Sequence, residues 1–233
     1  MKINWTKFLS ILSIIILILS IIIIFIIYKK NNNKRRNFGK RYLNIIKRYE
    51  KENNEINNNN NKNNIDIIFL GDSLFFHFNL KEFFPEFSTL NRGIRGDTTF
   101  GVENRLKVSV FDVKSKIVVM LIGVNNINTM IENYESILIK FKENINDRKI
   151  ILCSLTPMSG KYAIRNKMAI VNNIIIKKLA KKYDFYFVDL FTPLLNNETN
   201  EITDEYTKEG LHFTHDGYVV IAKEIRNILD KIK

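Results

Sequence analysis

The chain has 233 residues, of which 45% are hydrophobic, so it can bury the core of one domain of ordinary size. Its net charge of +12 is uneven, because residues 1–64 carry 13 lysines and arginines against 3 glutamates, whereas residues 65–233 carry 23 against 21 acidic residues. A nucleic-acid-binding domain would carry the positive excess itself, so nucleic acid is not an expected partner. With Cys153 as the only cysteine, an internal disulfide and a cysteine-based metal cluster are excluded.

The N-terminal segment is strongly apolar. Residues 8–28 contain no charged side chain and are dominated by isoleucine and leucine. As a helix with a rise of about 1.5 Å per residue, this segment would span roughly the 30 Å hydrocarbon core of a bilayer. No small-residue cleavage site follows it, which disfavours a signal peptide. We therefore expect residues 1–30 to form a single-pass transmembrane anchor; the basic residues after it favour a cytoplasmic domain, with an exported domain as the alternative.

The next segment, residues 31–64, is basic and then rich in asparagine. Residues 37–52 have a weak helical spacing of apolar side chains, which fits an amphipathic helix at the membrane surface or a solvated stalk. Residues 53–64 form a low-complexity asparagine tract with little to bury. We expect a linker here and place the start of the folded domain at residue 65.

From residue 65 onward, apolar runs typical of buried strands alternate with helical patterns. The expected strands are 65–70, 88–91, 116–123, 149–155 and 186–190. The expected helical segments are 74–87, 98–108, 131–146, 163–183 and 217–232. This alternation predicts an α/β fold, a three-layer α/β/α sandwich around a five-stranded parallel sheet.

Small polar motifs follow several of these strands. They are Gly71-Asp72-Ser73, Gly96-Asp97, Gly123-Val124-Asn125 and, before the last helix, Glu209-Gly210-Leu211-His212. Loops at the carboxyl ends of parallel strands open on one edge of the sheet. A serine, a histidine, a carboxylate and amide donors are the groups that acyl transfer requires. For the first motif alone, a helix cap formed by Asp72 or Ser73 would be the simpler explanation.

In this order, the four motifs resemble those of the SGNH, or GDSL-type, hydrolase family, near its platelet-activating-factor-acetylhydrolase-like and carbohydrate-acetylesterase branches. The second motif extends over residues 91–99, Asn-Arg-Gly-Ile-Arg-Gly-Asp-Thr-Thr. The resemblance covers residues 65–233 and implies a flavodoxin-like sheet. It implies Ser73 as nucleophile, His212 as general base, and an oxyanion hole formed by the N–H groups of Ser73 and Gly96 and the amide of Asn125. It implies no metal and no other cofactor.

Two residues depart from the family pattern. Glu209 stands where the family usually has aspartate; we expect it to orient His212, with a backbone carbonyl, Asp204 or Asp216 as alternatives. Arg95 stands where a small residue is common. Arg95 and Asp72 are candidates for the substrate mouth, where Arg95 would favour an anionic group, although a solvated loop arginine is the simpler interpretation.

The remaining chemistry-bearing residues are expected to be structural. His77 is expected in the core or in a wall, His215 as a cap or surface residue, and Cys153 inside a strand. A set of phenylalanines is expected to pack helices against the core rather than to line the site. They are Phe75, Phe76, Phe78, Phe83, Phe84 and Phe87.

Together, these features predict a membrane-anchored serine esterase that acts on a short-chain acyl ester, such as an acetyl ester of a glycan or lipid. The same serine could instead serve an O-acyltransferase, because both reactions share an acyl-enzyme intermediate. A non-catalytic, membrane-anchored binding domain is the third alternative, and Glu209 is the one feature that favours it.

Overall fold

The structure, a computed structural model, describes residues 19–20, 22–24, 29, 39–58 and 65–232. The expected anchor at residues 8–28 lies largely outside these ranges, as do residues 59–64 of the expected linker. Within the described ranges, no helix combines the length and the apolar character that crossing a membrane requires. The chain divides into two units, Met1–Lys47 and Arg48–Lys233, and the second contains all the predicted site residues.

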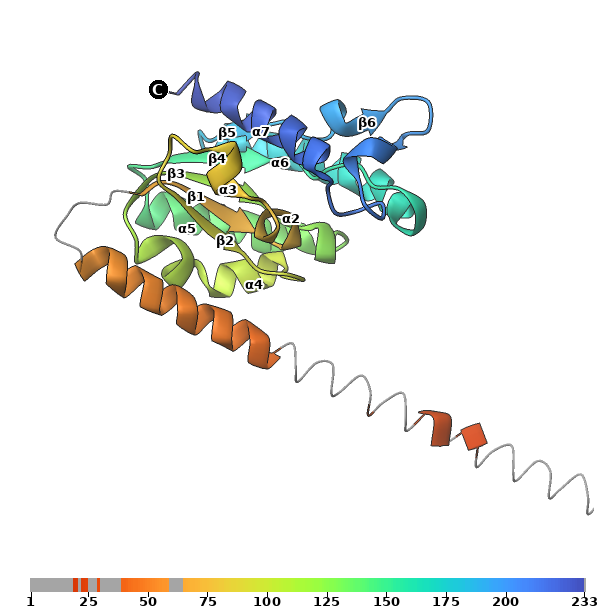
Figure 1. The fold of residues 1–233 in the computed structure, drawn as a ribbon, viewed down its shortest axis with the longest axis horizontal. Coiled ribbons are helices and arrows are strands. Elements are labelled where there is room, and N and C mark those ends of the chain that lie inside the picture. Colours follow the sequence, from red (N-terminus) through yellow and green to blue (C-terminus); the bar gives the residue numbers. More distant parts are fainter. Residues whose placement is uncertain (1–18, 21, 25–28, 30–38, 59–64, 233) are drawn as a thin grey trace, which may run out of the picture. The chain divides into compact units, whose positions relative to one another are not determined.

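Five parallel strands form the central sheet in the order β2-β1-β3-β4-β5 (Figure 1). They are β1 (Ile65–Gly71), β2 (Thr89–Gly93), β3 (Ser115–Leu121), β4 (Lys149–Cys153) and β5 (Tyr186–Val188). The predicted parallel sheet is therefore confirmed, and its strand order is the flavodoxin-like one. From β1, the chain adds β2 on one side and β3 on the other. In open parallel sheets, ligands bind at the carboxyl ends of the strands where the strand order changes in this way.

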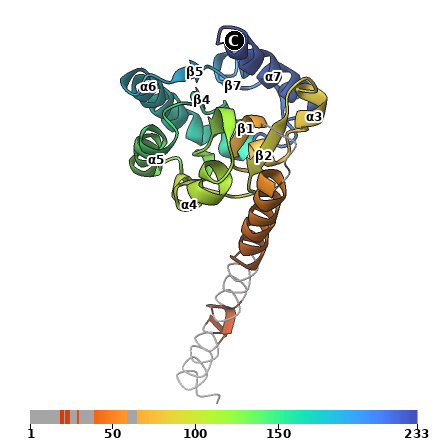
Figure 2. The same cartoon turned by 90° about the vertical axis from the view of Figure 1, so that its left-hand side faces the viewer.

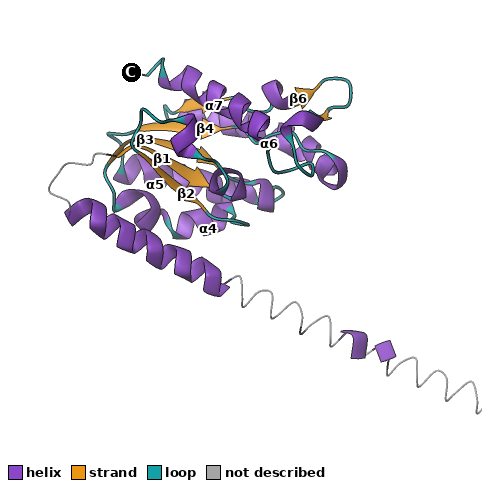
Figure 3. Ribbon diagram, in the orientation of Figure 1, coloured by secondary structure: helices purple, strands orange, loops and turns teal. Residues whose placement is uncertain are grey.

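Helices cover both faces of the sheet. They are α2 (Ser73–Phe76), α3 (Leu80–Phe83), α4 (Thr99–Asn104), α5 (Met130–Asn144), α6 (Asn166–Lys182) and α7 (His215–Leu229). Figure 2 shows α4, α5 and α6 on one side of the strands and α3 and α7 on the other. Figure 3 shows the strands lying between these helical layers, as the predicted sandwich requires. A small antiparallel pair, β6 (Leu195–Asn196) and β7 (Glu201–Ile202), was not predicted.

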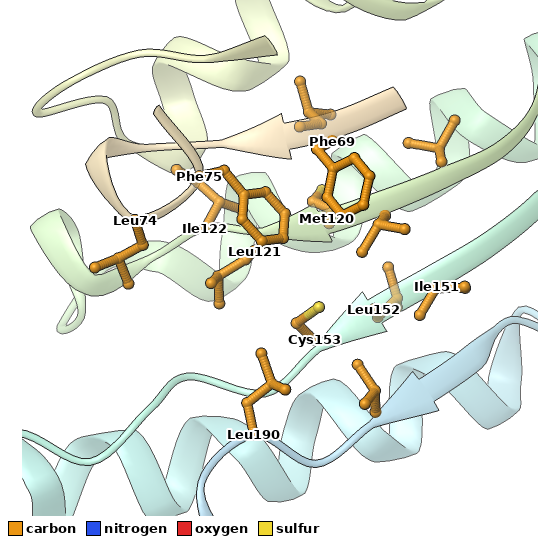
Figure 4. Close-up of a cluster of buried hydrophobic side chains, with 14 of the residues drawn as sticks. Phe69, Leu74, Phe75, Met120, Leu121, Ile122, Ile151, Leu152, Cys153 and Leu190 are labelled. Atoms are coloured by element: carbon orange, nitrogen blue, oxygen red, sulfur yellow. The ribbon is translucent and has the colours of Figure 1, made fainter. Parts of the chain in front are cut away.

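The core lies between the sheet and these helices, and β1, β3 and β4 supply much of it (Figure 4). Phe75, Phe78 and Phe84 are buried around Phe69, with ring centroids 5.1–5.9 Å from its own. Such pairs add to the free energy gained by burying the rings themselves. The prediction that the phenylalanines pack the core is confirmed for these three, while Phe76, Phe83 and Phe87 are half-buried.

The second unit begins earlier than the expected domain boundary at residue 65, because residues 48–58 of the helix 39–58 belong to it. Tyr49 and Asn53 are buried in this unit. The Asn53 side-chain amide donates to the Val108 carbonyl at 2.7 Å, and that of Asn57 donates to the Asp112 carbonyl at 2.9 Å. The asparagine tract was expected to have nothing to bury, but the side-chain amides of Asn53 and Asn57 satisfy backbone carbonyls of the domain.

Candidate active site

Ser73 stands where β1 turns into α2. Asp72 is the N-cap of this helix, and its Oδ1 accepts the Leu74 N–H at 2.9 Å. Ser73 is 6% exposed and follows the carboxyl end of β1, beside β3, where the strand order reverses. Asp72 is fully buried. Its expected place in the substrate mouth is therefore wrong, because its buried carboxylate caps the helix that begins at Ser73.

His212 connects the serine to a carboxylate. Its Nε2 lies 2.9 Å from Ser73 Oγ, and its Nδ1 is hydrogen-bonded to Glu209 Oε1. When Nδ1–H donates a hydrogen bond to Glu209, Nε2 is left as the acceptor for the serine hydroxyl. The structure therefore brings these three predicted residues together, and Glu209 faces His212 in the place that the family gives to aspartate. Asp216, one of the alternatives, instead lies against His215 at 3.5 Å.

A short turn presents both Glu209 and His212. The His212 carbonyl accepts the Lys208 N–H at 2.8 Å and the Thr207 hydroxyl at 3.1 Å. Gly210 adopts a φ of +89°, and a Cβ at this position would lie 2.4 Å from the Ser159 carbonyl oxygen. Only glycine fits this combination of left-handed backbone and close approach. The turn is thus fixed by backbone bonds, one of them from Ser159, and by the Thr207 hydroxyl.

The predicted oxyanion donors lie on adjacent loops. Gly96 has a φ of +76°, and its N–H has no acceptor among the residues that the structure describes; the same is true of the Ser73 N–H. The Asn125 side-chain amide donates to the Asp97 carbonyl at 2.8 Å, which places it against the turn that carries Gly96. An amide has a second N–H, so Asn125 retains one donor for a substrate oxygen.

Sequence reasoning missed the buried arginine that joins these loops. Arg105 is 3% exposed, and its Nε lies 2.7 Å from Oδ2 of Asp97, which is also 3% exposed. Its Nη2 donates to the Gly71 carbonyl at 2.9 Å, and its Nη1 donates to Ser109 Oγ at 2.8 Å. Arg105 therefore connects the turn at residues 94–97, which contains Gly96 and is called the oxyanion turn below, to Gly71, two residues before Ser73. The available signal was that Arg105 shares one face of the expected helix with Val102 and Val108.

Burial sets the charge of the two carboxyls beneath the site. It raises the pKa of Asp72 to about 7, with a further upward contribution from the charge of Asp97. Burial also raises the pKa of Asp97, although Arg105 opposes this shift. Oδ2 of Asp72 is buried with no hydrogen-bond partner in the described part of the chain, which fits a carboxyl that holds a proton. A partly neutral Asp72 opposes the negative charge of an oxyanion less than an ionised one would.

Two residues that can carry positive charge lie near the rim of the site. The His77 ring lies edge-on to that of His212, with centroids 5.8 Å apart. His77 is exposed rather than part of the core, and desolvation, followed by the charges of Arg95, His212 and Lys208, lowers its pKa. Arg95 is exposed, with its guanidinium 5.9 Å from the Phe76 ring centroid. Its charge contributes to the lowered pKa of His77, whose ring neighbours that of His212.

Two further residues lie away from the catalytic contacts. His215 is exposed at the start of α7, where it forms an ion pair with Glu82, so its predicted surface position is confirmed. Cys153 is buried in β4, and burial raises the pKa of its thiol well above the ordinary range. The prediction that Cys153 is a core residue is therefore confirmed, and such a thiol is a poor nucleophile.

Comparison with known proteins identifies the family. The sequence profile of the GDSL-like Lipase/Acylhydrolase family matches residues 69–220. The chain belongs to the GDSL-like lipase/acylhydrolase family. It is 30% identical over 174 residues to the platelet-activating factor acetylhydrolase IB subunit alpha2 of Rattus norvegicus, a match that covers 70% of this chain and 76% of that protein.

Solved structures agree with this assignment. A GDSL-like lipase from Bacteroides thetaiotaomicron has a TM-score of 0.71 and 24% identity, covering 81% of this chain and 98% of its own. An acetyl xylan esterase has a TM-score of 0.58 and 18% identity, covering 70% of this chain and 99% of its own. Both likenesses show the shared fold. The resemblance inferred from the four motifs is confirmed, and the protein is an ester-hydrolysing enzyme of this family.

Proposed function

We propose that this GDSL-like enzyme hydrolyses a short-chain acyl ester, acetyl in particular, of a glycan or lipid, through an acyl-enzyme intermediate on Ser73. The observation that carries the proposal is the chain of contacts from Ser73 through His212 to Glu209. The names of two similar proteins, an acetylhydrolase and an acetyl xylan esterase, support the choice of acetyl.

The first half-reaction forms the acyl-enzyme. Ser73 Oγ attacks the ester carbonyl carbon while His212 Nε2 takes the hydroxyl proton, and Glu209 stabilises the imidazolium that results. The carbonyl electron pair moves to oxygen, where the N–H groups of Ser73 and Gly96 and the Asn125 amide donate to it. Removing one such donor typically costs about 2.7–4 kcal/mol of transition-state stabilisation. The carbon–oxygen bond to the leaving alcohol then breaks, and His212 gives the alcohol its proton.

The second half-reaction frees the serine. Water attacks the acyl carbonyl as His212 again takes a proton, the same donors hold the oxyanion, and the bond to Ser73 Oγ breaks with return of the proton. The products are a carboxylic acid and the original enzyme. An alcohol in place of water would give a new ester, which is the acyltransferase alternative.

The test is hydrolysis of a chain-length series of p-nitrophenyl esters by the full chain and by Ser73→Ala. We expect turnover to be highest for acetate and to be lost in Ser73→Ala. Mass spectrometry after rapid acid quenching should find one acetyl group on the peptide that contains Ser73. Equal turnover by Ser73→Ala would overturn the proposal, and increased alcohol-dependent ester formation in the presence of a sugar would favour the acyltransferase.

We also propose that residues 8–28 anchor the enzyme in a membrane, because that segment is uncharged and long enough to span one. After expression of the full chain, alkaline carbonate should leave it in the membrane pellet and detergent should release it. A chain that carbonate releases would contradict an integral anchor.

A further inference from the structure

One peptide group connects the nucleophile to the oxyanion turn. The Ile94 N–H donates to the Gly71 carbonyl at 3.1 Å, and Gly71 lies two residues before Ser73. On the other side of the same peptide, the Gly93 carbonyl accepts the Tyr49 hydroxyl at 3.0 Å. The Gly93–Ile94 peptide plane is therefore fixed from both sides. It leads directly into the turn closed by the Asp97 N–H bond to the Ile94 carbonyl, and this turn contains Gly96.

Gly93 is also held by close packing. A Cβ at this position would lie 2.3 Å from the Phe76 backbone nitrogen, so the α2 backbone lies directly against it. Only a residue without a side chain allows this approach. Gly93 is thus confined by the α2 backbone on one side and by the hydroxyl of Tyr49 on another.

Tyr49 is itself placed by a buried arginine. Arg92 is 1% exposed, and its guanidinium lies 4.3 Å from the Tyr49 ring centroid. Arg92 Nη2 donates to Asn53 Oδ1 at 2.7 Å, and Nη1 forms an ion pair with Glu52. Three side chains of one helix therefore contact the end of β2. Burial raises the pKa of Tyr49, so its hydroxyl keeps the proton that it donates to Gly93.

We propose that the helical residues 49–53 are a positioning element for the oxyanion hole, in which Tyr49 fixes the Gly93–Ile94 peptide and thereby the direction of the Gly96 N–H. These residues precede the stretch 69–220 that the family profile matches. The inference rests on the proposed function, because it assigns Tyr49 a task only if Gly96 serves as an oxyanion donor.

The test compares two variants of the same helix in the full chain. Tyr49→Phe removes the hydroxyl bond to Gly93 and keeps the ring over Arg92. Asn57→Ala removes a bond of the same helix to Asp112, which precedes β3 at the opposite end of the sheet. Because a misplaced catalytic group can cost up to roughly 100-fold in rate, we expect Tyr49→Phe to lower kcat for p-nitrophenyl acetate about 10-fold, with KM within about twofold. Asn57→Ala should leave both unchanged.

Phenylboronic acid separates positioning from stability, since its tetrahedral serine adduct uses the oxyanion donors. Tyr49→Phe should raise its inhibition constant by about the factor lost in kcat, whereas Asn57→Ala should not. If Tyr49→Phe lowers only the melting temperature, or both variants lose kcat equally, the inference is overturned. If Tyr49→Phe does not fold, Glu52→Gln takes its place. Glu52 is half-exposed, and this substitution weakens its ion pair with Arg92, the residue that holds the Tyr49 ring. An unchanged kcat in Glu52→Gln overturns the inference. Absence of Ser73-dependent turnover in the unaltered enzyme would instead overturn the proposed function, and this inference with it.

Discussion

The two sides of the active site are supported in different ways. On the triad side, backbone bonds and the Thr207 hydroxyl hold the turn that carries His212 and Glu209, whose side chains are 29% and 41% exposed. On the oxyanion side, the buried pair of Asp97 and Arg105 holds the turn in place. A solvent-accessible carboxylate can be removed at little cost to folding, whereas one partner of a buried ion pair cannot. Substitutions on the two sides should therefore separate activity from stability.

The largest expected effect is that of Arg105→Met. It leaves the Asp97 charge buried without a partner, so we expect the unfolding free energy to fall by about 3–5 kcal/mol, with loss of most esterase activity. Urea denaturation followed by circular dichroism measures the change. The double variant Asp97→Asn/Arg105→Met should recover part of the stability, and Lys107→Met, at an exposed ion pair, should stay within about 0.5 kcal/mol of the unaltered protein. If Arg105→Met were as stable as Lys107→Met, the expected dependence of the oxyanion side on its buried ion pair would be contradicted.

Glu209→Gln should show the opposite pattern. The neutral amide no longer stabilises the His212 imidazolium, so we expect kcat to fall on the order of 10³-fold. The melting temperature should change little, because Glu209 is partly exposed and its turn is held by backbone bonds. Glu209→Asp keeps the charge and should retain more activity. A loss of less than tenfold in Glu209→Gln would mean that another group orients His212.

Asp72→Asn should change how stability depends on pH. Because the folded-state pKa of Asp72 is raised to about 7, the folded protein keeps a proton that the unfolded chain loses near pH 4. The contribution of Asp72 to stability is therefore lost as pH rises from about 4 to 7. The amide of the variant would not titrate and could still cap α2.

We expect the difference in unfolding free energy between Asp72→Asn and the unaltered protein to grow by more than about 1.4 kcal/mol over this range, the equivalent of one pKa unit. Urea denaturation at pH 4.5 and pH 7.5 measures it. A difference that is constant with pH would show that Asp72 is ionised throughout.

The smallest expected effect is that of Arg95→Ala on the oxyanion side. As an exposed cation beside His77, Arg95 should raise kcat/KM for an acetyl ester that carries a nearby carboxylate by about threefold to tenfold. Comparison of 4-acetoxybenzoate with phenyl acetate, at low and high salt, measures the preference. Phenyl acetate should be unaffected by the substitution, and an equal change with both esters would indicate that Arg95 instead supports the turn.

Much of this architecture could be predicted from the order of residues along the chain. The apolar run before Ser73 predicted β1, and the alternation of strands and helices predicted the parallel sheet. The Glu209-to-His212 motif predicted which residues meet the serine, because it resembles the motif that supplies the histidine in this family. The contacts of Arg105 and Tyr49 that support the oxyanion turn could not be predicted in this way. They depend on which buried polar groups still need a hydrogen-bond partner after the chain has folded.

The sequence by itself therefore determined the fold class and the family and predicted the catalytic groups, since local periodicity and short motifs encode these features. The tertiary structure decided that Asp72 is a buried cap, that Arg105 bridges Asp97 to Gly71, and that an asparagine-rich helix forms part of the domain. The physical reason is the same in each case. A buried charge or carbonyl must be satisfied by whichever group folding brings to it, and that partner can lie far away in the chain.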